Sequence, residues 1–119
     1  MRLERVFAIK FASLYPAYVK KVQSKGRTTA ELDLVLRWLT GHTPAGFKKV
    51  LASDQDLQTF FAKAPKLNPH VSLVTGVVCG VRVEDVEDPL MKKIRIMDKL
   101  VDELAKGRAL EKILRKPVA

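Results

Sequence analysis

The side chains with the greatest intrinsic reactivity are a single cysteine, Cys79, and two histidines, His42 and His70. A nucleophilic cysteine needs a nearby base and an accessible, electropositive setting, because the thiolate is the reactive form. Cys79 instead stands between valines and a glycine, and free cysteine is among the most buried residue types. One cysteine and two histidines also lack the spacing of a zinc site. The sequence therefore predicts that Cys79 is an inert core residue, and it predicts no catalytic residue.

An acidic run at 84–88 is the other feature that could carry chemistry. Clustered carboxylates can hold a hard cation through oxygen ligands, or share a proton for acid–base work. The run lacks the ligand pattern of a calcium-binding loop, and nearby Arg82 can pair with its acids. Negative charge ahead of a helix that starts at Asp88 also stabilises the positive end of the helix dipole. The sequence therefore predicts no metal site and no cofactor.

The segment at 25–29 joins two predicted helices, and there Arg27 together with free backbone N–H groups could bind an anion. It lacks the glycines, lysine and hydroxyl of a nucleoside triphosphate loop. Its outline also fits a helix–turn–helix DNA reader, which needs hydrogen-bond donors at the start of the second helix. That helix opens with Glu31 and Asp33 and offers only Arg37 as a base-reaching cation. An ordinary hairpin of two helices is the preferred interpretation.

These observations single out one set of candidate residues for a pocket or an anion site. The set combines the loop cation, the sole tryptophan and the polar or reactive residues at 70–85. It consists of Arg27, Trp38, His70, Cys79, Arg82, Glu84 and Asp85. The sequence leaves open whether these side chains meet in one pocket.

The element expected to organise the core is an amphipathic helix at 88–107. Its apolar residues step by four, three, four and three, the spacing of a continuous stripe on one helix face. They are Leu90, Ile94, Met97, Val101 and Leu104. Asp88 and Pro89 suit the N-cap and the first helical position, and Lys106 with Gly107 supplies a stop.

Four shorter amphipathic helices are predicted in the first half of the chain. Their predicted starts are Ser13, Thr28, Thr43 and Ser53. Thr28 with Glu31 forms a capping box for the helix at 28–41. The apolar arc of that helix is widened by Leu34 and Trp38, which indicates burial on more than one side. A last short helix follows Gly107 and ends at Pro117.

For two stretches the sequence does not decide between a helix and an extended strand. Residues 3–11 suit a short strand or an extended arm. Asn68 and Pro69 suit a helix start, but the valines that follow are β-branched and equally suit a buried strand. A helix to about Cys79 is favoured, with short strands at 3–11 and 71–86 as the alternative. The predicted fold class is mainly α, a compact bundle of about five to six short helices.

The composition is that of an ordinary globule, with 47% hydrophobic and 29% charged residues, and it predicts a single domain over 1–119. No apolar run approaches the roughly 20 residues needed to cross a bilayer, and the N-terminus lacks a cleavage site of small residues. A single cysteine agrees with a reducing compartment. The sequence therefore predicts a cytoplasmic protein with no membrane partner.

The formal net charge is +9, and the excess is spread over both halves of the chain. An excess of cations attracts phosphate backbones, so weak nucleic-acid binding is one hypothesis. The preferred alternative is that this charge keeps the protein soluble, because no basic tail or stripe stands out.

Four stretches of the chain carry a family resemblance. They are FASLYPAYV at 11–19, KGRTTAELDLVLRWLTG at 25–41, FFAKAPKLNP at 60–69 and the segment at 76–115. In these stretches the chain resembles a small family of conserved bacterial proteins, the domain of unknown function number twenty-two hundred. The family has no assigned activity, so the resemblance implies a cytoplasmic bacterial-type protein and no catalytic residue.

The function that these observations favour is a helical binding or protein-interaction module. A protein partner or a second copy would dock on an exposed apolar face of the helix at 28–41 or 88–107. The alternative is a nucleic-acid binder without sequence specificity. A small enzyme with a site near Cys79 and the acidic run is the least favoured hypothesis. The ligand, the oligomeric state and the biological role stay open.

Overall fold

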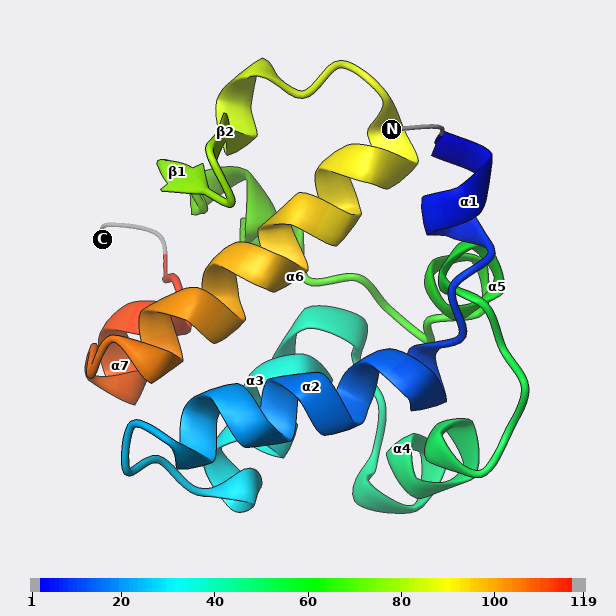
Figure 1. Ribbon diagram of the computed structural model, residues 1–119, viewed down its shortest axis with the longest axis horizontal. Coiled ribbons are helices and arrows are strands. Elements are labelled where there is room, and N and C mark those ends of the chain that lie inside the picture. Colours follow the sequence, from blue (N-terminus) through cyan, green and yellow to red (C-terminus); the bar gives the residue numbers. More distant parts are fainter. Residues whose placement is uncertain (1–2, 117–119) are drawn as a thin grey trace.

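Helix α6 (Pro89–Ala105) runs through the middle of the protein in the computed structural model, which describes residues 3–116 (Figure 1). The Asp88 carboxylate accepts a hydrogen bond from the Met91 backbone N–H at 2.8 Å, and Pro89 occupies the first helical position. Beyond the helix, Gly107 has a φ of 90°, in the left-handed region that glycine favours. The helix predicted at 88–107 is confirmed.

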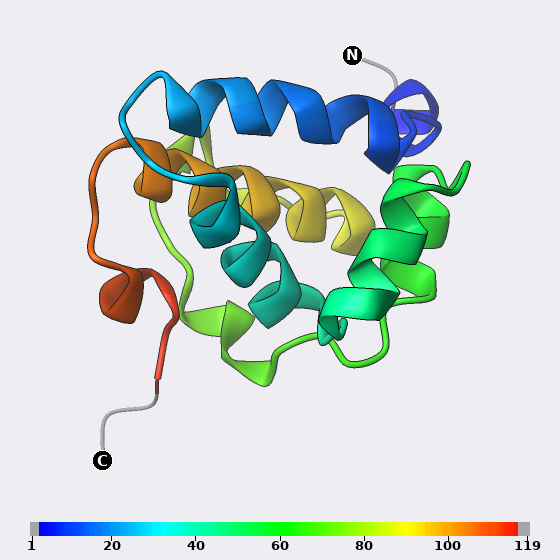
Figure 2. The ribbon, with the colours of Figure 1, turned by 90° about the horizontal axis from the view of Figure 1, so that it is seen from below.

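Five helices lie within residues 3–62. They are α1 (Leu3–Phe7), α2 (Phe11–Gln23), α3 (Thr29–Thr40), α4 (Pro44–Leu51) and α5 (Leu57–Ala62). Helices α2 and α3 pack against each other and against α6, and α4 packs on α2. Seen from below, α3 lies in front of α6, with α2 above it and α4 to its right (Figure 2).

Two predicted helix starts are confirmed by side-chain caps. Thr28 Oγ1 accepts a hydrogen bond from the Glu31 N–H at 3.1 Å, and the Glu31 carboxylate accepts from the Thr28 N–H at 3.0 Å. Thr43 Oγ1 caps α4 by accepting a hydrogen bond from the Gly46 N–H at 3.0 Å. Helix α3 ends at Gly41, where φ is 80° and an added Cβ would lie 2.7 Å from the Lys66 carbonyl oxygen. A side chain at that position would therefore have to displace the backbone of another segment.

Two other predicted starts are wrong. Helix α5 begins after Asp56, whose carboxylate accepts a hydrogen bond from a backbone N–H of the first turn, whereas Ser53 donates to a carbonyl of α4. Helix α2 begins at Phe11, ahead of the predicted Ser13 cap. The buried Phe11 ring stacks on Phe60 with ring centroids 4.0 Å apart. Packing in the core thus extends α2 beyond the start that its local sequence indicates.

The strand predicted at 3–11 is also wrong, because most of this stretch forms α1. The short helix packs on α5 and buries Val6. The chain is extended only at Lys10, which forms an isolated antiparallel bridge with Asp56. One bridge of this kind is too short to count as a strand.

Residues 69–85 connect α5 to α6 through short elements. They are the 3₁₀ helix η1 (Pro69–Leu73), strands β1 (Val77–Val78) and β2 (Val81–Arg82), and the 3₁₀ helix η2 (Val83–Asp85). The strands pair antiparallel, with Val77 opposite Arg82 and Val78 opposite Val81. The strand alternative for 71–86 is therefore confirmed, and the favoured helix to Cys79 is wrong. A helix would have placed β-branched valines in close succession, whereas the hairpin buries Val78 and leaves Val77 exposed.

Helix α7 (Leu110–Ile113) is held against α6 by a cluster of charged side chains. At its centre is Glu103 of α6, which is only 5% exposed. The Arg115 guanidinium donates to both Glu103 oxygens, one of them at 2.7 Å, and Arg108 lies 3.0 Å from the same carboxylate. Lys99 is more distant, at 3.9 Å. Pro117, the predicted end of the last helix, lies outside the described residues.

Because helices and the hairpin pack around it, α6 is buried over a wider arc than the predicted stripe. Met97 and Val101 are fully buried as expected, while Leu90 is only half-buried. The additional buried side chains of this helix are Met91, Ile96, Leu100, Glu103 and Ala105. Within residues 3–116 the chain forms seven α-helices, so the predicted mainly α fold is confirmed. In that part of the chain, no helix has both the length and the apolar character needed to span a membrane.

Candidate functional site

The structure distributes the seven predicted site residues over several parts of the molecule. Four of them lie on the hairpin and on η2: Cys79, Arg82, Glu84 and Asp85. His70 is half-buried in η1, Arg27 lies in the loop between α2 and α3, and Trp38 lies on α3. Arg82 and Glu84 are brought within 3.8 Å of each other.

Cys79 is exposed at the tip of the β1–β2 hairpin, so its predicted place in the core is wrong. Cys79 and Gly80 have φ values of 52° and 75°. Positive φ at both central residues is the pattern of a two-residue type I′ turn, whose twist matches that of paired strands. The valines around Cys79 indicated burial, but the turn directs this residue outward and leaves burial to Val78.

We expect a maleimide to label the native Cys79 thiol at nearly the rate found in the denatured protein. The reason is its exposure, since a reagent needs no unfolding step to reach it. The measurement is the labelling rate in buffer and in denaturant, followed by mass spectrometry. The Cys79→Ser variant, which has no other cysteine, serves as the unlabelled control. A native rate at least about tenfold slower than the denatured rate would contradict the exposed position.

The acidic run supports local structure. Glu84 accepts a hydrogen bond from the Gly76 backbone N–H at 2.7 Å, and this bond lowers the pKa of the Glu84 carboxyl. Asp88 caps α6. Within residues 3–116, no three His, Cys, Asp or Glu side chains are grouped so that they could hold a metal ion.

Arg27 is engaged by protein acceptors. Its guanidinium lies 2.8 Å from Glu31 and donates to the carbonyl oxygens of Leu104, at 3.3 Å, and Arg108, at 2.9 Å. The hydrogen bond from Arg27 is the largest cause that lowers the pKa of Glu31, to about 2. The side chain expected to bind an anion thus ties the α2–α3 loop to the end of α6.

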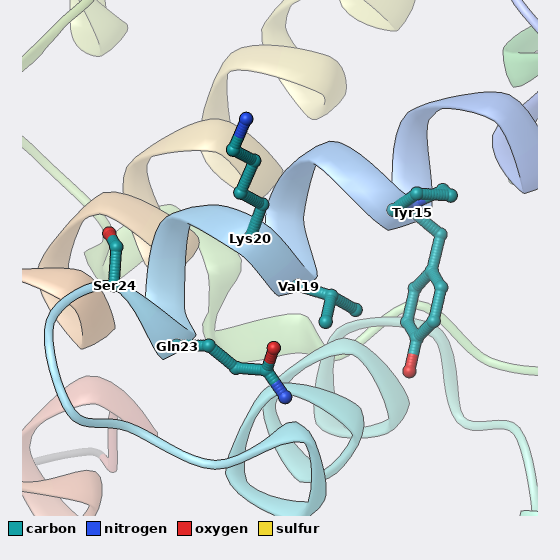
Figure 3. Close-up of a pocket in the computed structure, with 6 residues that line it drawn as sticks. Tyr15, Val19, Lys20, Gln23 and Ser24 are labelled. Carbon is teal, nitrogen blue, oxygen red and sulfur yellow. The ribbon is translucent and has the colours of Figure 1, made fainter.

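A groove with a volume of about 620 Å³ lies on the outer surface of α2. We call it the α2 groove. It is lined by Tyr15, Pro16, Val19, Lys20, Gln23 and Ser24. Tyr15, Val19 and Gln23 point toward α3, whereas Lys20 points the opposite way (Figure 3). The groove therefore lies between two rows of side chains that are spaced by four residues on one helix.

A second hollow of about 420 Å³ lies between α3 and α4. We call it the α3–α4 hollow. Its lining residues are Ala30, Asp33, Leu34, Arg37, Pro44, Phe47, Lys48 and Leu51. The Tyr15 hydroxyl from the α2 groove donates a hydrogen bond to Asp33 of this hollow. That bond brings one lining residue of each hollow into contact, and we call the two neighbouring hollows together the docking strip.

The docking strip combines apolar surface with positive charge. Leu34 is 41% exposed although it is a large aliphatic side chain. The cations that line the strip are Lys20, Arg37 and Lys48. Its acid, Asp33, is engaged by Tyr15, and burial together with the Asp33 bond raises the pKa of the Tyr15 hydroxyl. The strip therefore carries a net positive charge at neutral pH.

Trp38 lines a smaller hollow of about 260 Å³ that lies next to the α3–α4 hollow, on the other side of Leu34 and Arg37. This hollow shares Leu34 and Arg37 with the docking strip and includes His42 and Leu114. The His42 ring packs against Phe47 and Phe60, and burial lowers its pKa. The outer face of α3 is therefore hollowed on both sides.

The sequence indicated part of this surface and missed the rest. Leu34 and Trp38 stood out because they widen the apolar arc of α3 beyond one stripe, but the burial predicted from that arc is wrong for Leu34, which is exposed. Tyr15 and Asp33 were missed, since their contact joins residues 18 positions apart and follows from the packing of two helices. In the sequence, Tyr15 is indistinguishable from an ordinary core aromatic residue.

The fold and its hollows define a small, mainly helical protein with open grooves on its surface. The chain belongs to the family described as "Uncharacterized protein conserved in bacteria (DUF2200)", whose model matches residues 5–115. The family resemblance seen in the sequence is thereby confirmed.

The chain is also similar to the crystal structure of uncharacterized protein SP1917. The two share 39% sequence identity with a TM-score of 0.88, over 95% of this chain and 93% of that chain. This similarity supports the mainly helical fold and names no activity. No curated protein matches the chain in sequence.

Proposed function

We propose that this protein is a single-domain protein-interaction module whose docking strip binds an acidic amphipathic helix of a partner protein. The observation that carries the proposal is the hydrogen bond from Tyr15 to Asp33, which places the hollows lined by α2, α3 and α4 side by side. Exposed apolar surface of this kind is typical of interaction sites when polar residues surround it.

The shape of the α2 groove favours a helix as the bound element. Rows of side chains spaced by four residues are the ridges between which a second helix inserts its own ridge. On α2 these rows are Tyr15–Val19–Gln23 and Pro16–Lys20–Ser24. Pro16 and Val19 supply apolar contact at one end of the groove, and Leu34 continues that contact onto α3.

The charge of the strip favours an acidic partner over a second copy of this chain. In a dimer with two-fold symmetry the same patch faces itself, so the cations Lys20, Arg37 and Lys48 of one copy would face the same positive patch on the other copy. Like charges brought together in an interface are unfavourable. Glutamate and aspartate on the flanks of an apolar stripe would instead complement all three cations.

The nucleic-acid alternative has less support from the contacts. Lys21 lies 3.2 Å from Asp102, and Arg27 lies 2.8 Å from Glu31, so both cations are already engaged by carboxylates. Each engaged cation is one fewer available to release counterions from a phosphate backbone. Weak binding without sequence preference stays the prediction for duplex DNA.

The proposal is tested with a displayed library of random peptides of about 15 residues, roughly four helical turns. We expect the protein to select peptides with acidic flanks and apolar residues at spacings of three and four. A selected peptide should bind Leu34→Glu at least about tenfold more weakly, because the new charge would be buried beside apolar contacts. Fluorescence anisotropy of the labelled peptide measures the affinity.

The matched control is Leu73→Glu, since Leu73 is 44% exposed but lies on η1, outside the strip. This variant should bind the selected peptides as the unaltered protein does. Selection of basic peptides, selection of no helical pattern, or equal losses in both variants would contradict the proposal. Sedimentation equilibrium provides a further test. If the unaltered protein is a dimer and Leu34→Glu is a monomer, the docking strip binds a second copy of the chain and not an acidic helix of a partner.

A further inference from the structure

A third hollow, of about 170 Å³, lies apart from the docking strip and shares no lining residue with it. Side chains of α1, α2, α5 and α6 surround it, together with one residue of the α1–α2 connection. Its apolar lining residues are Val6, Ile9, Leu14, Leu57, Met91 and Ile94. An apolar cavity of about 150 Å³ is large enough to hold benzene, so this hollow is of a size for a small organic group.

Two charged side chains, Arg95 and Asp98, complete the lining of this hollow, which we call the Arg95 hollow. The Tyr18 hydroxyl donates a hydrogen bond to Asp98 Oδ1 at 2.5 Å. The second oxygen, Oδ2, lies 3.5 Å from Arg95 Nη1, which is at the limit of a hydrogen bond. Asp98 therefore keeps one carboxylate oxygen that is only weakly engaged.

Arg95 is similarly under-used. Its side chain is only 18% exposed, and among the described residues Asp98 is its one hydrogen-bond acceptor. A guanidinium carries five N–H donors in a planar fork that suits a carboxylate. Arg95 thus offers donors, and Asp98 offers an acceptor, one helical turn apart beside an apolar hollow.

We propose that the Arg95 hollow binds a small aliphatic α-amino acid. The carboxylate of the ligand would pair with Arg95, its ammonium group with Asp98 Oδ2, and its side chain would fill the apolar part of the hollow. The lining contains no aromatic ring, so it provides dispersion contacts for an aliphatic chain and no stacking surface. Met91 adds a flexible side chain that adapts to ligand shape.

The electrostatics of Asp98 agree with this assignment. Burial raises the pKa of the Asp98 carboxyl, against the opposing effects of the Tyr18 hydrogen bond and the Arg95 and Lys21 charges. An ammonium group placed beside this carboxylate would stabilise its charged form. A ligand with a carboxylate alone would instead bring a second negative charge toward Asp98.

The test is titration of the protein with leucine, 4-methylpentanoate and 3-methylbutylamine, followed by calorimetry and by amide chemical shifts. We expect leucine to bind with a dissociation constant below about 1 mM and each analogue at least about tenfold more weakly. Leucine should shift the amide signals of Val6, Met91 and Arg95 and leave those of the docking strip unchanged.

Three variants locate the site. Asp98→Asn keeps an oxygen that can accept the Tyr18 hydrogen bond but removes the charge, and Arg95→Gln removes the guanidinium; both should weaken leucine binding at least about tenfold. Ile9→Trp alters an exposed side chain at the edge of the hollow, so it should block binding without disturbing the core. Asp54→Asn, on the exposed Lys10–Asp54 pair, is the control and should bind as the unaltered protein does.

The proposal is overturned if no leucine binding is detected at concentrations up to about 10 mM. A dissociation constant above that value would be too weak for a preformed amino-acid site. Equal affinity for 4-methylpentanoate or 3-methylbutylamine would overturn the assignment to an α-amino acid. Shifts confined to other surfaces, or leucine binding that survives Ile9→Trp, would place the ligand elsewhere and overturn it as well. Because the chemical shifts need no variant, the test stands even where a substitution prevents folding.

Discussion

The Met97→Asp variant is expected to lose cooperative unfolding altogether. Met97 is fully buried on α6, the helix around which the other elements pack. An aspartate there would bury an unpaired charge or a protonated carboxyl without a partner, at a cost of several kcal/mol. Domains of this size are stable by about 5–15 kcal/mol in total, so this single change removes much or all of the margin.

Thermal and urea unfolding followed by circular dichroism measure this effect. Met97→Leu is the volume-conserving control and should cost less than about 1.5 kcal/mol. Lys93→Asp places the same residue on a half-buried position of the same helix and should leave a cooperative transition. An unchanged melting temperature in Met97→Asp would mean that Met97 faces solvent and that α6 packs differently.

The second large effect is expected for Glu103→Ala, which removes the carboxylate at the centre of the charged cluster between α6 and α7. Glu103 is 5% exposed, and its loss leaves the nearly buried Arg115 without its carboxylate partner. Removing one partner of a buried ion pair typically costs about 3–5 kcal/mol, because the other charge stays buried and unpaired.

Replacing both Glu103 and Arg115 distinguishes two effects: the loss of their ion pair, and the cost of leaving the Arg115 charge buried without a partner. The double variant Glu103→Met with Arg115→Met should recover part of the loss, since the nearly buried Arg115 charge is removed together with its partner. Of the two other cations near Glu103, Arg108 is 41% exposed and Lys99 keeps the Val77 carbonyl oxygen as an acceptor. Asp54→Ala is the exposed comparison: Asp54 lies 3.5 Å from Lys10, but its side chain is 94% exposed, so we expect no measurable change. The measurement is the urea midpoint of unfolding for the unaltered protein, Glu103→Ala, the double variant and Asp54→Ala. Equal midpoints for Glu103→Ala and Asp54→Ala would contradict the structural role of the cluster.

Local signals in the sequence predicted much of the helical framework. The capping box of Thr28 and Glu31 and the start at Asp88 and Pro89 were predictable because each involves residues within one turn of each other. The start of α2 was not, since it depends on the stacking of Phe11 on Phe60, which lies far along the chain. Local preference decides a helix end only where packing does not override it.

The segment at 69–85 shows a second limit of prediction. Its valines fit both a helix and a strand. The segment forms a hairpin because the chain turns back at Cys79 and Gly80, where both φ values are positive. A cysteine with positive φ has no clear sequence signal, because such turns favour Asn, Asp or Gly. Exposure of Cys79 was therefore unpredictable from its apolar neighbours.

The candidate sites were the least predictable feature. The docking strip depends on the meeting of Tyr15 with Asp33, and the Arg95 hollow on the meeting of Tyr18 with Asp98, which are 80 positions apart. None of these four residues forms a motif along the chain. Arg27 shows the reverse case, since it stood out in the sequence as an anion ligand and contacts protein groups in the structure.

The contacts that α2 and the α2–α3 loop make with α6 also constrain how the chain folds during its synthesis. Tyr18 meets Asp98, Lys21 meets Asp102 and Arg27 meets the Leu104 carbonyl, with separations of 80, 81 and 77 residues. Contacts of such range form slowly compared with those inside a helix, because a long loop must close first. The faces of α2 and α3 that pack on α6 are therefore uncovered when these helices leave the ribosome, and they stay exposed to other chains until α6 has been made.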